Sequence, residues 1–302
     1  MPSPTLSRPL EPGATIGILG GGQLGRMLAQ AAADLGFKTH IYCNEVDSPA
    51  FDVAARHTVG KYDDKTALAA FAKSVNVVTF EFENVPEIAP TILSASVAVA
   101  PPPQALAVAQ DRMLERRFLM GLGIPVSPHK VIGTEKQVED AFQEIGAPAI
   151  LKTCRMGYDG KGQKRVSSTA ETREAFAAFH GVPCLLEKVI DFSFEASVIA
   201  ARGSDGSFVA YEPPENEHRE RILRRSAVPS RLAPRQIDEA QDMARKIAEA
   251  LDYVGVLCVE LFVNKDGALL VNEIAPRVHN SGHWTIEACV ISQFFGRNTA
   301  FF

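Results

Sequence analysis

Apolar residues recur with two different periods along the first hundred residues, and the two periods alternate. Short apolar runs predict buried strands at 14–19, 38–42, 75–80 and 97–100. Helical spacing predicts helices at 23–35 and 67–73. Strands that alternate with helices are typical of a parallel, open sheet. Three prolines at 101–103 then interrupt the pattern, and we interpret them as a domain boundary.

The rest of the chain is richer in strands. Helices are predicted at 111–122, 135–145 and 234–251. Strands are predicted at 127–132, 149–153, 182–187, 193–201, 208–211 and 221–228. We therefore predict an α/β and α+β chain of three parts: a Rossmann-like domain over 1–100, a linker and small subdomain over 101–180, and a large subdomain over 181–302.

A hairpin near the end of the chain carries two acidic residues. Asp266-Gly267 favours a two-residue turn, in which Lys265 pairs with Ala268 and Glu260 lies opposite Glu273. A four-residue loop keeps both carboxylates on one face, whereas a slip of one residue separates them. Neighbouring carboxylates are unfavourable unless a cation lies between them, and two such ligands beside phosphates are how proteins hold Mg²⁺. The alternative is an ordinary hairpin with one buried and one solvated glutamate.

Two loops are rich in glycine. Gly20-Gly21-Gly22-Gln23-Leu24-Gly25 lies between a predicted strand and a predicted helix, and Glu45 follows as in dinucleotide-binding folds. Amides at a helix N-terminus bind any phosphate or carboxylate, so phosphate binding is the general prediction and NAD binding the alternative. Gly157-Tyr158-Asp159-Gly160-Lys161-Gly162 lies between two predicted strands, like a flap over nucleotide phosphates that Lys152 could reach. The alternative here is a flexible hairpin tip with an exposed lysine.

Four motifs belong together: Gly20–Met27, Thr79–Pro86, Gly157–Gln163 and Asn272–Trp284. Together they resemble the ATP-grasp superfamily and, within it, the 5-(carboxyamino)imidazole ribonucleotide synthetase family of purine biosynthesis. The resemblance covers roughly residues 14 to 293. It implies a ligase that uses ATP and bicarbonate to carboxylate 5-aminoimidazole ribonucleotide through carboxyphosphate.

Two other functions remain open at this stage. Formate-dependent phosphoribosylglycinamide formyltransferase has a similar architecture. An NAD-dependent oxidoreductase would explain the first glycine loop, but it leaves the second loop and the acidic hairpin without a role.

The resemblance also implies a role for each matching residue. Glu260 and Glu273 match Mg²⁺ ligands. The residues implied in catalysis are Arg277, His279, Tyr158 and Asp159. The residues implied to bind ATP are Arg112, Lys152, Gly157 to Gln163, Glu187, Lys188, Val189, Ile190, Glu195, His218, Asn272 and Glu273. The residues implied to bind the ribotide are Gly21, Gly22, Gln23, Leu24, Glu81 and Asn84.

Some of these residues also have a simpler interpretation. His218, standing alone, reads as a surface histidine. For Glu81 and Glu83 the simpler interpretation is helix-capping acids ahead of Pro86, and for Glu83 the two interpretations fit equally well.

Charge, cysteine content and the length of apolar runs limit the classes of partner that we expect. The net charge is −5 without a long basic run, which disfavours nucleic-acid binding. The five cysteines are scattered and odd in number, which disfavours a disulfide framework and favours a reducing cytoplasm. No apolar run approaches the length of a membrane span. We expect a cytoplasmic enzyme without a membrane partner, and a homodimer, as is common in the family.

The last residues depart from the family pattern. Residues 291–294 still follow it, whereas 295–302 do not. Members of the family continue into a small C-terminal domain with basic residues for the substrate. We therefore expect a truncated chain that lacks part of the substrate pocket, and a form that binds nucleotide without turnover is a further alternative.

Overall fold

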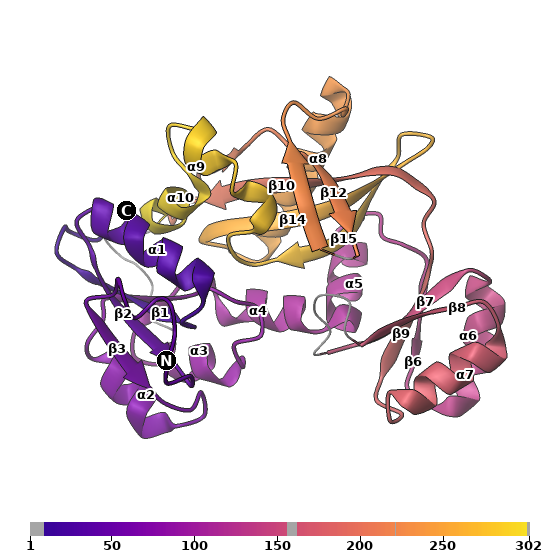
Figure 1. Ribbon diagram of the computed structural model, residues 1–302, viewed down its shortest axis with the longest axis horizontal. Helices are drawn as coiled ribbons and strands as arrows, with labels where there is room; N and C mark the ends of the chain where they lie inside the picture. The colour runs from indigo at the N-terminus through magenta and orange to yellow at the C-terminus, as the bar shows by residue number, and fades with distance from the viewer. Residues whose placement is uncertain (1–8, 156–161, 221, 301–302) are drawn as a thin grey trace.

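The computed structural model describes residues 9–155, 162–220 and 222–300, and these residues form three β-sheets (Figure 1). The first sheet is parallel, with strand order β3-β2-β1-β4-β5. Its strands are β1 (Thr15–Leu19), β2 (Lys38–Cys43), β3 (Arg56–Val59), β4 (Val77–Phe80) and β5 (Ala98–Val99). Its helices are α1 (Gln23–Asp34), α2 (Lys65–Ala72) and α3 (Ile88–Leu93).

A smaller antiparallel sheet follows, with strand order β6-β9-β7-β8. Its strands are β6 (His129–Ile132), β7 (Ala149–Thr153), β8 (Gln163–Val166) and β9 (Cys184–Lys188). Its helical segments are η1 (Glu135–Gln137), α6 (Val138–Ile145) and α7 (Thr169–Ala178). Two helices, α4 (Pro103–Gln110) and α5 (Arg112–Gly121), connect it to the first sheet (Figure 1).

The third and largest sheet is antiparallel, with strand order β13-β12-β10-β14-β15 and β11 beside β10. Its strands are β10 (Phe192–Arg202), β11 (Phe208–Ala210), β12 (Glu215–Arg219), β13 (Ile222–Ala227), β14 (Gly255–Asn264) and β15 (Leu269–Ala275). The helical segments are α8 (Pro234–Ala250), η2 (Asn280–Gly282), α9 (Thr285–Ala288) and α10 (Gln293–Thr299).

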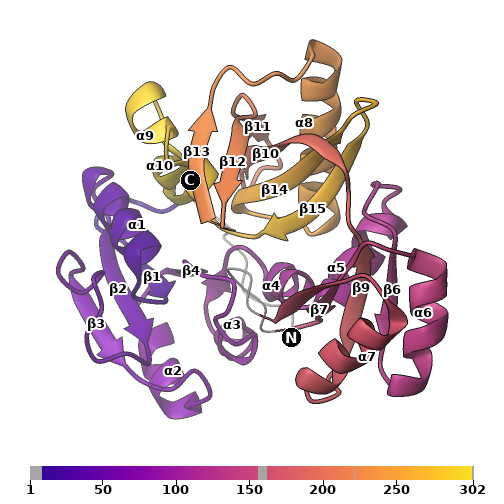
Figure 2. The ribbon, with the colours of Figure 1, turned by 45° about the vertical axis from the view of Figure 1, so that its right-hand side comes forward.

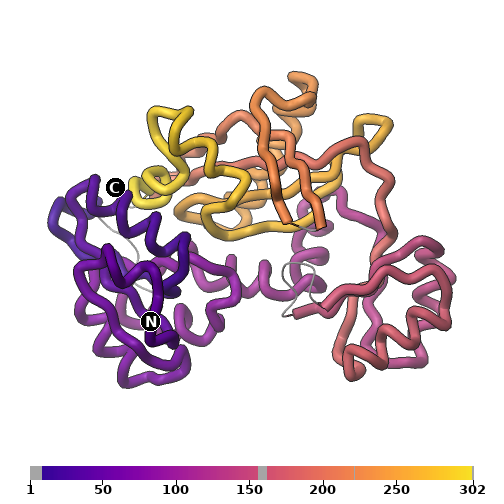
Figure 3. The backbone as a smooth tube through the Cα atoms, viewed as in Figure 1, coloured from indigo at the N-terminus to yellow at the C-terminus, as the bar shows by residue number. Residues whose placement is uncertain are grey.

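The hydrophobic cores join two of the three sheets. Ile16 and Ile18 of β1 and Leu28 of α1 belong to the same buried cluster as Val256 of β14 and Phe294 of α10. The tube in Figure 3 shows the C-terminal segment, in yellow, lying against α1, in indigo. The small sheet has a separate cluster over α6 and α7. The first and third sheets are therefore packed together through apolar contacts.

The predicted elements are largely confirmed, but their boundaries are not all correct. The three prolines do not end regular structure, because α4 begins at Pro103, where a missing N–H is harmless. β3 and β12 were not predicted, since both are mainly polar. Among the described residues, no helix combines the length and the apolar character that a bilayer crossing needs.

The β14–β15 turn differs from both predicted loops. The Asn264 N–H donates to the Ala268 oxygen at 2.9 Å, which leaves residues 265–267 as a three-residue loop. Gly267 takes a φ of +87°, the left-handed conformation that closes such loops and that glycine adopts without strain. The predicted pairing of Lys265 with Ala268 is therefore wrong.

A β-bulge compensates for the odd loop length. Next to the turn, the pairing is shifted by one residue, so that Leu261 lies opposite Val271. β15 then takes up one extra residue at Asn272, and beyond it Glu260 pairs with Glu273. The predicted cross-strand pair is confirmed, although two irregularities produce it instead of a regular hairpin.

Candidate active site

The strands β14 and β15 pass above α4 and α5 (Figure 2), and the two hairpin carboxylates, Glu260 and Glu273, are paired across these strands. Glu260 is the more enclosed: 14% of its side chain is exposed, against 41% for Glu273. Burial and the negative charge of Glu260 raise the pKa of Glu273. Two carboxylates that disfavour each other, one of them open to solvent, form the donor set that suits a hard divalent cation.

Glu260 is held on both oxygens by neighbouring side chains. His279 Nε2 lies 3.1 Å from Glu260 Oε1, and Asn272 Nδ2 donates to Oε2 at 3.2 Å. Burial alone would raise the pKa of Glu260, but the hydrogen bond from His279 and the nearby charges bring it down to about 2. The bulge matters here, because it turns Asn272 toward the same carboxylate that faces Glu273.

Glu260 and Glu273 fit Mg²⁺ as a pair that substrate phosphates would complete. Within the described part of the chain, no cluster of three or more histidine, cysteine or acidic side chains could hold a metal by itself. A magnesium ion in a nucleotide site is typically bound by one or two carboxylates together with phosphates. The residues present therefore fit a nucleotide-dependent magnesium site better than a permanent metal centre.

A buried ion network connects the hairpin to the small sheet. Lys152 of β7 contacts Glu187 of β9, and Arg116 Nε of α5 donates to the same carboxylate at 2.8 Å. Arg116 Nη2 also donates to the Asn272 carbonyl at 2.7 Å. Burial opposes ionisation of Glu187, but the charges of Lys152 and Arg116 lower its pKa to about 2. The side chain of Lys152 is only 13% exposed, which contradicts the alternative of an exposed hairpin lysine.

Sequence reasoning missed Glu115 and Arg116. Glu115 accepts from Arg116 Nη1 at 2.8 Å and from the Ile274 N–H at 2.7 Å, so it ties α5 to β15. Adjacent charged residues on a predicted helix normally lie on its solvated side. Nothing in their spacing marks them as buried. Nearby, Arg112 at the start of α5 lies 3.7 Å from Glu273, where a matching phosphate-contact residue is expected.

Glu195 and His218, two residues that the family resemblance assigns to the ATP site, lie next to each other. His218 Nδ1 is 2.8 Å from Glu195 Oε2, across the neighbouring strands β10 and β12. This hydrogen bond, opposed by burial, raises the pKa of His218. The interpretation of His218 as an ordinary surface histidine is therefore wrong.

The first glycine loop already holds an anion from its own chain. The carboxylate of Glu81, just after β4, accepts from the Gly22 and Gly25 N–H groups at 2.6 Å each. A Cβ on Gly20 would come within 2.6 Å of the Glu81 side chain, which explains glycine at that position. Burial raises the pKa of Glu81, although the two amides oppose the shift. Glu81 caps α1, so the predicted capping of a helix ahead of Pro86 is wrong.

Glu83 binds Arg277 instead of capping a helix. Arg277 donates to Glu83 through Nε and, at 2.9 Å, through Nη2, while Nη1 donates to the Val278 carbonyl at 3.0 Å. This pair bridges the first sheet and the segment after β15. Asn84 follows in the same turn and is half-buried.

The flap predicted from the second glycine loop falls partly outside the described residues. Gly157, Tyr158, Asp159, Gly160 and Lys161 all lie there. On either side of them, β7 and β8 pair in antiparallel fashion, with Lys152 opposite Gln163, and Thr153 N–H donates to the Gly162 oxygen at 2.8 Å. The predicted strand–loop–strand arrangement is confirmed for its two strands.

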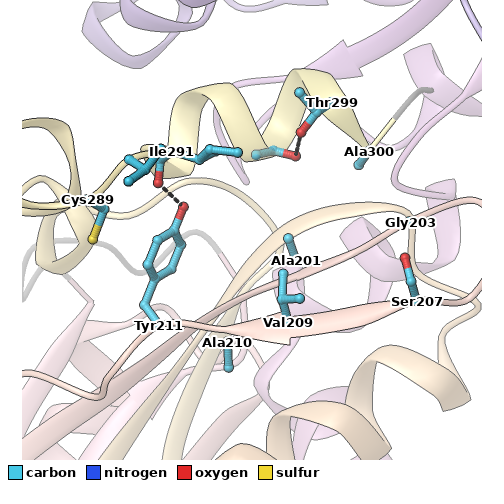
Figure 4. A pocket seen from close by; sticks show the side chains of 12 residues that line it. Ala201, Gly203, Ser207, Val209, Ala210, Tyr211, Cys289, Ile291, Thr299 and Ala300 are labelled. Atoms are coloured by element: carbon cyan, nitrogen blue, oxygen red, sulfur yellow. Dashed lines mark hydrogen bonds between the residues drawn. The ribbon is translucent and has the colours of Figure 1, made fainter.

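A cavity of about 490 Å³ lies elsewhere, along β10, β11 and the segment before α10 (Figure 4). Tyr211 points into it and donates its hydroxyl to the Ile291 carbonyl at 2.8 Å. The cavity is mostly apolar, and no residue predicted for catalysis or for ligand binding lines it. We do not assign it to the active site.

Comparison with known proteins identifies the family. The ATP-grasp domain profile matches residues 117–294, and the ribonucleotide synthetase preATP-grasp domain profile matches 13–110. The N5-carboxyaminoimidazole ribonucleotide synthase of Brucella melitensis is 49% identical over 94% of this chain and 79% of its own length. The chain belongs to the N5-carboxyaminoimidazole ribonucleotide synthase family.

Solved structures of this synthase family agree with the fold. An ADP complex of an N5-carboxyaminoimidazole ribonucleotide synthetase has a TM-score of 0.93 at 38% identity, covering 97% of this chain and 78% of that one. The Aspergillus clavatus synthase in complex with ADP and 5-aminoimidazole ribonucleotide has a TM-score of 0.88 at 32% identity, covering 96% and 77%. The predicted ATP-grasp fold is confirmed, and membership of the synthase family replaces the oxidoreductase and formyltransferase alternatives.

Proposed function

We propose that this chain carboxylates 5-aminoimidazole ribonucleotide to N5-carboxyaminoimidazole ribonucleotide with ATP and bicarbonate, in purine biosynthesis. The observation that carries the proposal is the Glu260–Glu273 pair beside Arg112 and the Lys152 network, in a chain of the synthase family. The pair on β14 and β15 offers a cation site, and the basic groups of α5 and β7 beside it offer phosphate sites. The complexes of relatives with ADP and with the ribotide support the same substrates here.

The first step is phosphoryl transfer. An oxygen of bicarbonate attacks the γ-phosphorus of ATP, ADP leaves, and carboxyphosphate forms. The protein needs to supply little covalent chemistry, because positioning and charge stabilisation dominate such transfers. Lys152 and Arg112 hold the phosphates in this proposal, and Glu260 and Glu273 would hold Mg²⁺, which would neutralise charge on the phosphate oxygens.

The second step uses the exocyclic amine of the ribotide. The amine attacks the carboxyl carbon of carboxyphosphate, or the CO₂ it releases, phosphate leaves, and the amine loses a proton. We assign Asp159 to orient or deprotonate the amine, with Tyr158 beside the imidazole ring. Arg277 binds the carboxyphosphate oxygens with the two N–H groups that Glu83 and Val278 leave unused. His279, which contacts Glu260, is the other residue that we assign to catalysis.

The ribotide phosphate is assigned to the start of α1. Glu81 occupies the Gly22 and Gly25 amides, whereas the Gln23 and Leu24 amides have no acceptor among the described residues. An amide pair at the N-terminus of a twelve-residue helix is a ready anion site. Glu81 thus shapes the loop, and Gln23 and Leu24 bind the 5′-phosphate.

The adenine is assigned to the segment after β9. The Lys188 and Val189 N–H groups donate to Pro128 and Pro148 at 2.9 and 3.1 Å, which holds this segment in place. Ile190 N–H has no acceptor in the described part of the chain, so it is available to the adenine edge. Glu195, fixed by His218, then accepts the ribose hydroxyls.

The test is ADP release with Mg-ATP and bicarbonate, with and without 5-aminoimidazole ribonucleotide. We expect the ribotide to stimulate release. Glycinamide ribonucleotide with formate serves as the control and should have no effect, because it is the substrate pair of the related formyltransferase. ADP release that depends on the control pair, or no release with either ribotide, would contradict the proposal.

Two further properties belong to the proposal. We place the reaction in the cytoplasm and expect a homodimer in solution. Sedimentation velocity at micromolar chain concentration measures the second property directly.

A further inference from the structure

Arg297 of α10 is the feature that the proposed chemistry leaves unexplained. It is fully buried, with 0% exposure, near the end of the described residues. Burying an arginine is costly unless every donor finds an acceptor. All five N–H groups of this guanidinium do so, at distances of 2.9 to 3.3 Å.

The acceptors come from two different sheets. On one side, Nε and Nη2 donate to Thr79 Oγ1 and Nη2 also donates to the Phe80 carbonyl, both at the end of β4. On the other side, Nη1 donates to the Tyr253 hydroxyl and to the Val256 carbonyl of β14. One planar group therefore connects the parallel sheet to the large antiparallel sheet.

The backbone around Arg297 is shaped to receive it. A Cβ on Gly255 would lie 2.7 Å from Nη1, so the absence of a side chain there makes room for the guanidinium. The guanidinium carbon lies 5.6 Å from the centroid of the Phe80 ring. Within the described residues, no carboxylate forms an ion pair with Arg297, so what the arginine provides here is its rigid fork of donors.

Thr79 and Phe80 directly precede the acidic turn of the site. Glu81 follows and shapes the glycine loop, and Glu83 binds Arg277 beside the hairpin. We propose that Arg297 is a positioning residue: it fixes the end of β4 against β14, and thereby sets the ribotide-binding loop at a fixed distance from the Glu260–Glu273 pair. This inference rests on the proposed function.

The hydrogen bonds that Arg297 makes to both sheets have a geometric reason. The ribotide amine and the carboxyphosphate come from opposite sides of the site, and a misplacement of about 1 Å between reacting groups can lower a rate by roughly 100-fold. Apolar packing of α10 against α1 holds the two sheets together, but it does not fix the position of one strand end. The five directed hydrogen bonds of Arg297 fix that strand end in position.

The test compares Arg297→Lys with Asn298→Ala in the full chain. Lysine keeps the charge but has three donors on one nitrogen in place of five on a planar fork, so it cannot make all five hydrogen bonds. We expect KM for the ribotide to rise roughly tenfold while KM for ATP changes less than twofold. Asn298 Nδ2 donates to the Leu28 carbonyl at 3.1 Å and docks the same helix without contacting β4. Asn298→Ala should lower the melting temperature and leave both KM values unchanged.

A second variant keeps the proposal testable if Arg297→Lys folds poorly. Thr79→Val removes one acceptor, on the β4 side only, and should raise the ribotide KM in the same direction. Millimolar guanidinium chloride should restore part of the ribotide KM of Arg297→Ala, whereas ammonium chloride should not. Unchanged ribotide KM in folded Arg297→Lys and in Thr79→Val would overturn the proposal.

The wild-type chain separates this inference from the proposed function. If wild-type shows no ribotide-stimulated ADP release, the proposed function fails. If it does, and the Arg297 variants change the KM values for ATP and ribotide equally, only the positioning role fails.

Discussion

The first sheet and the small sheet are both attached to the large sheet, but by different kinds of contact. The first sheet shares a hydrophobic cluster with it through α1, β14 and Phe294. The small sheet keeps a core of its own and is joined mainly through charged side chains, with Glu187, Lys152 and Arg116 at the junction. Apolar burial fixes one half of the site, and an ion network attaches the other.

This difference matches the two ligands in the proposal. The ribotide loop lies on the half that is packed firmly against the large sheet. In the proposal, the ATP phosphates contact the half that is joined through Lys152, whose charge a phosphate can engage in place of the Glu187 carboxylate. Interfaces within a chain that are polar permit relative movement, whereas large apolar ones resist it. We therefore infer that nucleotide binding, more than ribotide binding, changes the arrangement of the sheets.

The largest expected effect comes from the hairpin that both halves share. Glu273→Gln removes one charge of the cation site while keeping its shape, so we expect at least a 1000-fold loss of ribotide-dependent ADP release. Steady-state kinetics measures the loss, and unchanged circular dichroism shows that the fold is intact. Glu249→Gln, on the exposed face of α8, is the matched control. Normal turnover in Glu273→Gln would exclude its role as a ligand.

Two phenylalanine truncations test the comparison of cores. Phe294→Ala lies in the shared cluster and should destabilise the first and large sheets together, by about 3–5 kcal/mol. Phe176→Ala lies in the small-sheet core and should produce a separate, early unfolding transition that leaves the first sheet protected. Amide hydrogen exchange resolved by segment distinguishes these results. Identical protection patterns in the two variants would show that the cores are not independent.

Acid should weaken the ion network that joins the small sheet to the large sheet. The pKa of Glu187 is about 2 in the folded chain, below its usual value of 4.5, so its contribution of about 3 kcal/mol is present above pH 4.5 and is lost as the pH falls toward 2. Titration of stability between pH 5 and pH 2 should show a smaller slope for Glu187→Gln than for wild-type. Equal slopes would mean that other carboxylates dominate acid unfolding.

The smallest effect is expected at Lys152. Lys152→Ala should raise KM for ATP by roughly 10- to 100-fold and leave KM for the ribotide unchanged, because Lys152 belongs to the small sheet. Calorimetric titration with ADP measures the affinity without turnover. A parallel rise in both KM values would contradict the separation of the two halves.

Much of the fold could be predicted because the local pattern of apolar and turn residues determines these elements. The strand–glycine loop–helix at 14–35 and strand Ala149–Thr153 follow directly from apolar periodicity and turn residues. β12 was missed because Glu-Asn-Glu-His-Arg has no apolar alternation, yet it carries His218. α10 was not predicted, because the sequence of its residues 295–299 was interpreted only as a departure from the family pattern; Phe294 in this helix is buried.

The residue types of the candidate site could be predicted from the sequence, but most of their hydrogen-bond partners could not. The pairing of Glu260 with Glu273 was correct, since cross-strand neighbours follow from the hairpin. The partners of Glu81, Glu83 and Arg297 are 41 to 218 residues away along the chain, and no local pattern encodes such distances. Their roles depend on how the sheets pack together.

The β14–β15 hairpin constrains the number of residues between Glu260 and Glu273. Its three-residue loop and its bulge each displace the register by one position, and the two displacements cancel before Glu273. The number of residues between the two glutamates must therefore keep its parity. Loss of a single loop residue would turn Glu273 to the opposite face of the sheet, whereas loss of one loop residue together with the bulge would not. Insertions and deletions in this hairpin should be tolerated only in pairs.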